Sequence, residues 1–190
     1  MNTIAKKENS NINGINTDRV VELATHMSQD DNYGKFCFSA QNEWINGSRS
    51  KTKIQNFYAG NSEQIERTTP LFVEADQPAF LAGENTSPNA VEHYLHSLTS
   101  CISTTIVAHA AVQGISITKL SVSAKGEMDA RGFFGVSDEV PRGYSKIKIS
   151  ILSKTNSDQE TIRSLINFSP VYEMASKSIP VHLSFSIEPG

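Results

Sequence analysis

Cysteine, long apolar runs and a charge excess of one sign are all scarce in this chain. Only two cysteines, Cys37 and Cys101, occur among 190 residues, which does not fit a disulfide scaffold. We expect both thiols to be free, with a Cys37–Cys101 bridge as the less favoured alternative. Lys and Arg number 17 and Asp and Glu 20, for a net charge of −3, and the basic residues are scattered. This pattern does not favour nucleic acid or an anionic membrane as a partner.

The longest apolar stretch is interrupted by polar residues such as Ser103 and His109, so we predict no membrane span. The N-terminal segment has two lysines but no apolar run behind them, unlike a signal peptide. We therefore predict a cytoplasmic protein in which residues 1–15 form a disordered arm and residues 16–190 form a single domain.

Apolar periodicity predicts an α+β protein, because strands, a helix, more strands and more helices follow one another along the chain. In the segment 157–168, Ser157 with Glu160 resembles a capping box. Ser169 followed by Pro170 predicts the start of the next helix. Helices are expected at 17–29, 89–114, 157–168 and 169–178, and strands at 35–44, 49–59, 68–76, 116–128, 144–154 and 179–189.

The central segment, "NAVEHYLHSLTSCISTTIVAHAAVQG", contains a single carboxylate, Glu92, and no lysine or arginine. Asn89 can cap this helix while Glu92 reaches back to it, and Gly114 is typical of the residue that ends a helix. A helix with almost no charge on any side must be surrounded by protein. A second subunit packed over it is a natural explanation.

Three blocks of sequence resemble the OsmC/Ohr superfamily of osmotically induced and organic-hydroperoxide-resistance proteins. They are "AFLAGENTSPNAVEHYLHSLTSCISTTIVAHAAVQGI", "GEMDARGFFGVSDEVPRGYSKIKISI" and "SPVYEMASKSIPV". The resemblance covers roughly residue 35 to the C-terminus. It implies an OsmC-like fold, with antiparallel sheets packed around a long central helix. It also implies an intertwined homodimer with sites at the subunit interface, and several members are thiol-dependent peroxidases.

The resemblance also assigns residues. Cys101 matches the family's reactive cysteine, Glu92 resembles the acidic residue upstream of it, and Arg49 looks like the arginine aimed at the thiolate. Where two-cysteine members carry a resolving cysteine before Pro-Val, this chain has Ser169. A hydroxyl cannot form a disulfide, so the position of the resolving cysteine is lost here.

Only a thiolate attacks a hydroperoxide, and an apolar helix interior disfavours the charged form, so Cys101 needs a nearby cation. Arg49 is our first candidate, and Arg131 or Arg142 could serve instead. Nine residues separate Glu92 from Cys101, or about 13.5 Å along the helix, and they lie on opposite faces. If two such helices cross antiparallel, Glu92 of one subunit lies level with Cys101 of the other. This arrangement predicts a site shared by two subunits.

Each of these residues also has an ordinary structural interpretation. Cys101 could be a small buried hydrophobic residue, Glu92 only a helix cap, and Arg49 only a solvated charge. Phe133 and Phe134 could line a pocket for an apolar peroxide, or could pack their loop onto the sheet.

Other side chains receive no role in the site. His93 and His96 lie just before Cys101, but the thiol points well away from His96 and no fourth ligand is near in sequence, so we expect no metal, and we expect no cofactor. His109 is expected to be an interface or core histidine, and Cys37 is expected to be an exposed bystander rather than a replacement resolving thiol.

The sequence therefore supports a redox protein of the oxidative stress response, a possible cysteine-based peroxidase. It would reduce organic or hydrogen peroxide through Cys101 with an external thiol as reductant. The alternative is a dimeric protein without catalysis that binds a small apolar or electrophilic ligand near Phe133 and Phe134. A purely structural role is a third interpretation.

Overall fold

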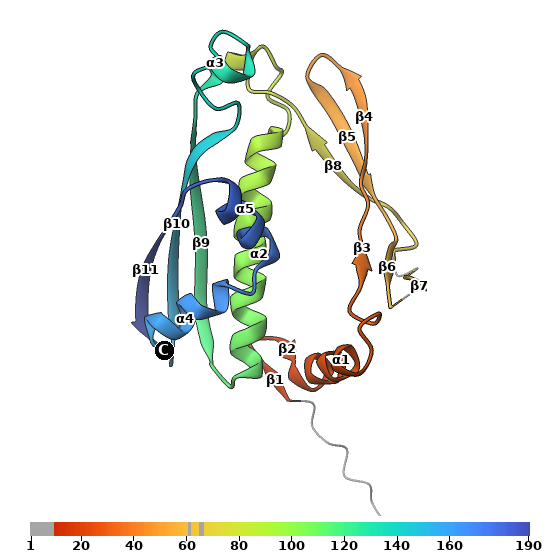
Figure 1. Ribbon diagram of the computed structural model, residues 1–190, viewed down its shortest axis with the longest axis vertical. Helices are drawn as coiled ribbons and strands as arrows, with labels where there is room; N and C mark the ends of the chain where they lie inside the picture. The colour runs from red at the N-terminus through yellow and green to blue at the C-terminus, as the bar shows by residue number, and fades with distance from the viewer. Residues whose placement is uncertain (1–9, 61, 65–66) are drawn as a thin grey trace, which may run out of the picture. The chain divides into compact units, whose positions relative to one another are not determined.

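The computed structural model describes residues 10–60, 62–64 and 67–190. The chain divides into two compact units (Figure 1). Unit 1 comprises Met1–Val20 and Leu95–Gly190, and unit 2 comprises Val21–Tyr94. The prediction of a single domain over 16–190 stays a prediction.

Unit 1 is built on a three-stranded sheet in the order β11-β10-β9. The strands are β9 (Ile117–Met128), β10 (Tyr144–Thr155) and β11 (Val181–Pro189), at the positions predicted from the sequence. β9 and β10 are antiparallel, as are the strand pairs of the other sheets, so the prediction of antiparallel sheets is confirmed for them. The pair β10 and β11 is parallel and departs from that prediction. The chain returns to the sheet through two helices, and such a crossover is the connection that parallel strands require.

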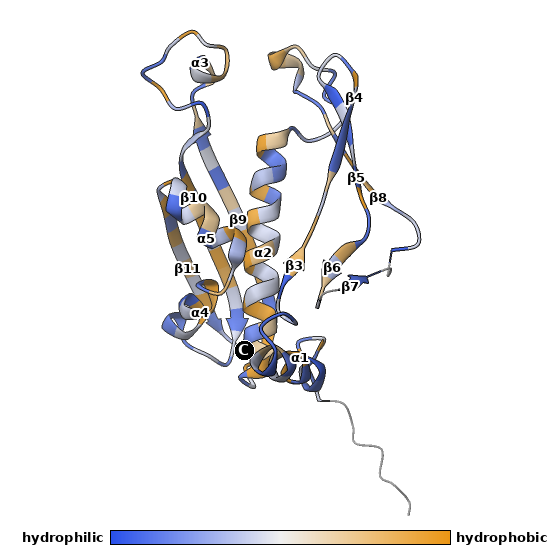
Figure 2. Cartoon of the chain, turned by 45° about the vertical axis from the view of Figure 1, so that its right-hand side comes forward, coloured by the Kyte–Doolittle hydropathy of each residue, from blue (hydrophilic) through white to orange (hydrophobic). Residues whose placement is uncertain are grey.

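Three helices lie along one face of this sheet: α2 (Ala90–Val112), α4 (Gln159–Ile166) and α5 (Pro170–Ser178) (Figure 1). Side chains of β10 alternate between buried isoleucines and exposed residues such as Lys148 and Ser150, because successive side chains of a strand point to opposite faces. The same alternation of hydropathy is visible along β9 (Figure 2). The fully buried apolar side chains are Leu98, Ile102, Ile106, Ala110, Ala111, Ile147, Ile149, Ile151, Ile162, Leu165, Ile166 and Ala175.

The ends of α2 confirm the capping predicted from the sequence. The Glu92 backbone N–H donates to Asn89 Oδ1 (2.9 Å), and the Asn89 N–H donates to Glu92 Oε2 (2.8 Å). At the other end, Gly114 has a φ of +74°, and the Ile115 N–H donates to the Ala110 carbonyl (2.8 Å). By length and hydropathy alone α2 passes as a membrane-crossing helix, a test that core helices of soluble proteins also pass.

The capping box predicted at Ser157 is wrong by one residue. Asp158 caps α4 by accepting from the Thr161 N–H at 2.7 Å. Ser157 instead donates its N–H to Thr155 Oγ1 (3.3 Å), which holds it in the preceding turn. Ser169 caps α5 as predicted, with Pro170 at the first helical position.

Unit 2 contains two small antiparallel sheets. One has the order β4-β5-β8, from Gln41–Asn46, Arg49–Ile54 and Leu71–Ala75, and the other has the order β3-β6-β7, from Phe36–Cys37, Phe57–Ala59 and Ser62–Gln64. The hairpin between β4 and β5 was predicted. The strands predicted at 35–44 and 49–59 are each divided in two, and β7 was not predicted.

The N-terminal region has more structure than the predicted arm. β1 (Asn11–Ile12) and β2 (Ile15–Asn16) form a hairpin, and α1 follows at Thr17–Gln29, the predicted range. The Asn13 side chain donates to the Ile115 carbonyl and accepts from the Ile117 N–H, both at 2.9 Å. Residues 1–9 of the predicted arm lie outside the described residues.

Candidate functional site

Cys101 lies on α2 within unit 1, and its thiol meets a hydroxyl group from a distant part of the chain. Cys101 is half-buried and belongs to no disulfide. Ser169, which has no exposed surface, donates from Oγ to the Cys101 Sγ at 3.2 Å. The position predicted for a missing resolving cysteine therefore touches the predicted reactive sulfur.

Ser169 is held in place by its capping role. Its Oγ accepts from the Tyr172 N–H (3.3 Å), and its own N–H donates to the Ile166 carbonyl (2.9 Å). Pro170 fixes the first turn of α5, whose free backbone N–H groups give this end a partial positive charge. Cys101 thus lies beside the end of a helix that favours a negative charge.

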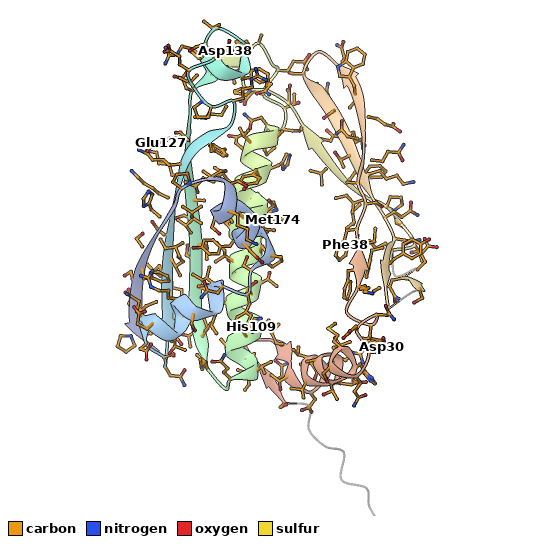
Figure 3. All side chains as sticks on the ribbon, in the orientation of Figure 1. Asp30, Phe38, His109, Glu127, Asp138 and Met174 are labelled. Atoms are coloured by element: carbon orange, nitrogen blue, oxygen red, sulfur yellow. The ribbon has the colours of Figure 1, made fainter. Side chains whose placement is uncertain are left out.

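Next to this contact, Phe168 stacks on His109, with ring centroids 4.3 Å apart and an interplanar angle of 13°. His109 follows Cys101 by about two turns of α2, and Figure 3 labels it on that helix. The Phe168 ring is still 60% exposed. The sequence predicted His109 as a core or interface residue but gave no indication of this partner.

Arg49 and Glu92 are held by other partners in the structure. Arg49 forms an ion pair with Glu84 (Nη1–Oε2, 3.5 Å) in which both side chains are partly exposed. Glu92 is used in the capping box with Asn89. Within the described part of the chain, the Cys101 sulfur accepts from Ser169, so the grouping of Cys101, Arg49 and Glu92 stays a prediction.

The two alternative arginines also have partners. Arg131 forms a forked pair with Asp129, which raises the pKa of Arg131 and lowers that of Asp129. Arg142 lies 3.9 Å from Asp138, and both side chains are largely exposed.

Phe133 and Phe134 lie at the end of the short helix α3 (Ala130–Phe133). They contact each other edge to face, with centroids 5.1 Å apart, and are 62% and 57% exposed. Both rings are thus more than half exposed. Their role as a substrate pocket stays a prediction.

A buried carboxylate that the sequence did not single out organises unit 2. Asp76 is 1% exposed and accepts hydrogen bonds from the hydroxyl groups of Ser48 (2.6 Å) and Thr86 (2.9 Å). It also accepts from the backbone N–H groups of Gln77, Glu84 and Thr86. The Ser48 and Thr86 bonds are the main reason that the pKa of Asp76 lies well below its ordinary value. Asp76 therefore fixes the turn before Arg49 and the loop that carries Glu84.

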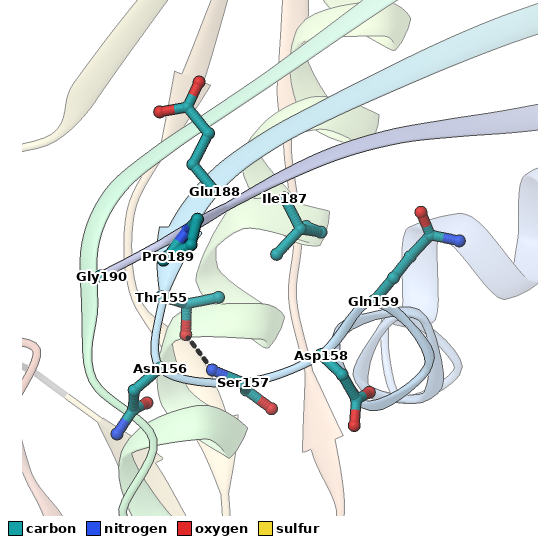
Figure 4. A pocket seen from close by; sticks show the side chains of 9 residues that line it. All are labelled: Thr155, Asn156, Ser157, Asp158, Gln159, Ile187, Glu188, Pro189 and Gly190. Carbon is teal, nitrogen blue, oxygen red and sulfur yellow. Dashed lines mark hydrogen bonds between the residues drawn. The ribbon is translucent and has the colours of Figure 1, made fainter.

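Two cavities lie away from the Cys101–Ser169 contact. One, of about 540 Å³, lies at the start of α4 and the end of β11, and Figure 4 shows the residues that line it, from Thr155 to Gln159 and from Ile187 to Gly190. The other, of about 420 Å³, is lined by Cys37, Ser39, Gln55, Asn56, Tyr58 and Glu63. Cys37 is exposed, as predicted. Within the described residues, no group of three or more His, Cys, Asp or Glu side chains could hold a metal ion.

Known structures share this fold at low sequence identity. An OsmC-like protein from Mycoplasma pneumoniae is 12% identical, with a TM-score of 0.57 over 80% of this chain and 97% of that one. An OsmC-like protein of unknown function from Vibrio cholerae is 9% identical, with a TM-score of 0.56 over 79% and 99%. An organic hydroperoxide resistance protein OsmC from Legionella pneumophila is 18% identical, with a TM-score of 0.52 over 79% and 96%.

A comparison with curated proteins gives no match. The family model described as OsmC-like protein matches residues 83–184, which include α2 with Cys101 and the start of α5 with Ser169. This match spans more than half of the chain and agrees with the fold shared with the solved structures. The chain therefore belongs to the OsmC-like protein family.

Proposed function

We propose that this protein is a thiol-dependent peroxidase that reduces organic or hydrogen peroxide through Cys101, with an external thiol as reductant. The observation that carries the proposal is the hydroxyl of Ser169 donating to the Cys101 sulfur at the N-terminal end of α5. A donor and a helix N-terminus aimed at one sulfur favour its anionic form, which is the nucleophile the reaction needs.

The first step is an attack by the Cys101 thiolate on one peroxide oxygen. The S–O bond forms as the O–O bond breaks, so sulfur is oxidised to a sulfenic acid and the peroxide is reduced. The departing alkoxide takes a proton from water and leaves as an alcohol, or as water when hydrogen peroxide reacts.

The sulfenic acid needs a thiol from outside, because Ser169 stands beside Cys101 where a resolving cysteine would be. A first external thiol displaces water and forms a mixed disulfide with Cys101. A second external thiol attacks its partner sulfur, which releases Cys101 reduced and the reductant as a disulfide. Cys37 takes no part in this scheme.

The proposal includes a homodimer whose second subunit supplies Arg49 and Glu92. The ion pair of Arg49 with Glu84 is partly exposed, and such pairs contribute little, so the guanidinium can change partner. Unit 2 also carries apolar surface that a second copy would cover. Its large apolar side chains that are at least 46% exposed are Val21, Phe36, Phe38, Trp44, Ile45, Tyr58, Leu71, Phe72 and Phe80.

The test is peroxide consumption by purified protein, with cumene hydroperoxide or hydrogen peroxide as substrate and a dithiol in excess. We expect turnover that disappears in Cys101→Ser and persists in Cys37→Ser, which is the matched control. No turnover above the dithiol alone, or full activity in Cys101→Ser, would reject the peroxidase proposal.

A second candidate function is ligand binding without catalysis, favoured by the exposed pair Phe133 and Phe134. In that case Cys101→Ser would bind an apolar ligand as tightly as the native chain, and Phe133→Ser with Phe134→Ser would weaken binding. Isothermal calorimetry with cumyl alcohol, the product of cumene hydroperoxide, measures both.

A further inference from the structure

Ser169 meets two groups at once, and these contacts decide where its proton points. A hydroxyl has one proton to donate and lone pairs to accept with. The Tyr172 N–H donates to Oγ, and Cys101 Sγ lies 3.2 Å from the same oxygen. The proton of Ser169 is therefore directed to the sulfur.

We infer that Ser169 is a positioning residue whose hydroxyl donates to the sulfur of Cys101, aims it for attack and stabilises the thiolate that reacts. This inference rests on the proposed peroxidase function. A sulfur that accepts a hydrogen bond is favoured as thiolate over thiol, because a bond to a charged group is stronger than one to a neutral group. Ser169 thus contributes to the attack by Cys101, and resolution of the sulfenic acid is left to the external thiol.

The surroundings of Ser169 support a directed hydrogen bond. Ser169 has no exposed surface, so water does not compete freely for its hydroxyl. Its backbone is fixed on both sides, since its N–H donates to Ile166 and its carbonyl accepts from the Glu173 N–H (2.9 Å). The Ser169 oxygen can move away from Cys101 only by giving up its place as the cap of α5.

The first experiment separates the hydroxyl from the helix cap. Glycine is almost as good an N-cap as serine, so Ser169→Gly removes the donor and largely keeps the cap. Asp158→Gly is the matched control, because Asp158 caps α4 by accepting from the Thr161 N–H. The measurement is the rate of Cys101 alkylation by iodoacetamide across pH, in a Cys37→Ser background and without peroxide.

We expect Ser169→Gly to slow alkylation about tenfold at neutral pH and to displace the profile to higher pH, the effect of losing one hydrogen bond to a charged group. Asp158→Gly should alkylate like the parent. An unchanged rate and profile in Ser169→Gly would overturn the inference, and so would an equal loss in Asp158→Gly. Because no peroxide is present, these outcomes do not depend on the peroxidase proposal.

The second experiment converts the contact into a covalent bond. Ser169→Cys puts a second sulfur beside Cys101, and a sulfenic acid at Cys101 would then condense with it to a disulfide and water. We expect one equivalent of peroxide to remove two hydrogen atoms from this variant in the Cys37→Ser background, as measured by mass spectrometry. The same variant with Cys101→Ser is the control and should not form the bond.

Two oxidants distinguish the peroxidase proposal from the inference about Ser169. If oxidised dithiothreitol joins Cys101 to the introduced thiol but peroxide does not, the geometry stands and the peroxidase proposal fails. If neither oxidant forms the bond in a folded variant, as judged by circular dichroism, Ser169 does not aim at the sulfur and the inference fails.

Discussion

Unit 1 and unit 2 bury different kinds of residue. Among the described residues, all twelve fully buried apolar side chains lie in unit 1, on α2, β10, α4 and α5. Within the described part of unit 2, the side chains classed as buried are polar, Asp76 and Asn89, while rings such as Trp44 and Phe38 are more than 60% exposed. Unit 1 therefore has an apolar core of its own, whereas the described side chains buried in unit 2 are polar and most of its large apolar side chains are exposed.

This difference bears on the candidate site. Cys101 and Ser169 are placed by the core of unit 1, and Arg49 is placed by the Asp76 cluster of unit 2. A core positions side chains by close packing. The loops of unit 2 are positioned by hydrogen bonds to the carboxylate of Asp76, and these bonds depend on its charge. The two parts of the proposed site should thus respond differently to mutation and to pH.

The largest effect is expected from a cavity in the core of unit 1. Ile149→Ala should lower the free energy of unfolding by about 2–5 kcal/mol, because Ile149 has no exposed surface in the middle of β10. Urea denaturation followed by circular dichroism measures the change. Val136→Ala, at a side chain that is 72% exposed, is the control and should change little. Equal losses in the two variants would contradict a core that is centred on the buried side chains of β10.

An intermediate effect is expected from the apolar surface of unit 2. Trp44→Ser and Phe72→Ser should each weaken self-association by about 2 kcal/mol, roughly thirtyfold in the dissociation constant, if a second copy covers these rings. Sedimentation equilibrium measures the constant. Phe133→Ser, at an exposed ring in unit 1, serves as a comparison. A chain that is monomeric before mutation would refute the proposed covering by a second copy.

The carboxylate of Asp76 gives unit 2 a dependence on pH. Since the pKa of Asp76 is lower in the folded state than in the unfolded chain, its contribution to stability is complete above the ordinary aspartate pKa of about 3.9. That contribution disappears as pH falls through the lowered folded-state pKa. Asp76→Asn should be less stable than the parent at pH 7, and the difference should shrink in acid. Urea midpoints across pH measure it, and a constant difference would contradict this role.

Sequence reasoning succeeded where the determining interactions are local. The apolar spacing of α1, the capping box of Asn89 with Glu92 and the cap at Ser169 act over a few residues, and the structure confirms each one. The parallel pairing of β11 and the contact of Ser169 with Cys101 join residues more than 30 positions apart. No local pattern specifies them, although the resemblance pointed to position 169.

The errors in unit 2 have a related cause. Alternation in 35–44 predicts a half-buried strand, but both Phe36 and Phe38 are exposed, and the segment forms only the two-residue β3 and the start of β4. Asp76 directly follows a strand, as many loop aspartates do, so its place in the sequence does not indicate a structural role. That role comes from five hydrogen-bond donors, which lie between Ser48 and Thr86. These donors become neighbours only when the loop folds.

The smallest effect is expected at the N-terminal hairpin, which tests whether unit 1 needs more than its core. Asn13 has a φ of +55° and bridges the Ile115 carbonyl and the Ile117 N–H just after α2. Asn13→Gly accommodates that backbone but loses both hydrogen bonds, so the free energy of unfolding should fall by about 1 kcal/mol. The measurement is amide hydrogen exchange at Ile117, which Asn13→Gly should speed. Asn42→Gly is the control and should leave this exchange unchanged. Because the core side chains stay in place, alkylation of Cys101 should keep its rate, and a faster rate would mean that the hairpin controls access to the thiol.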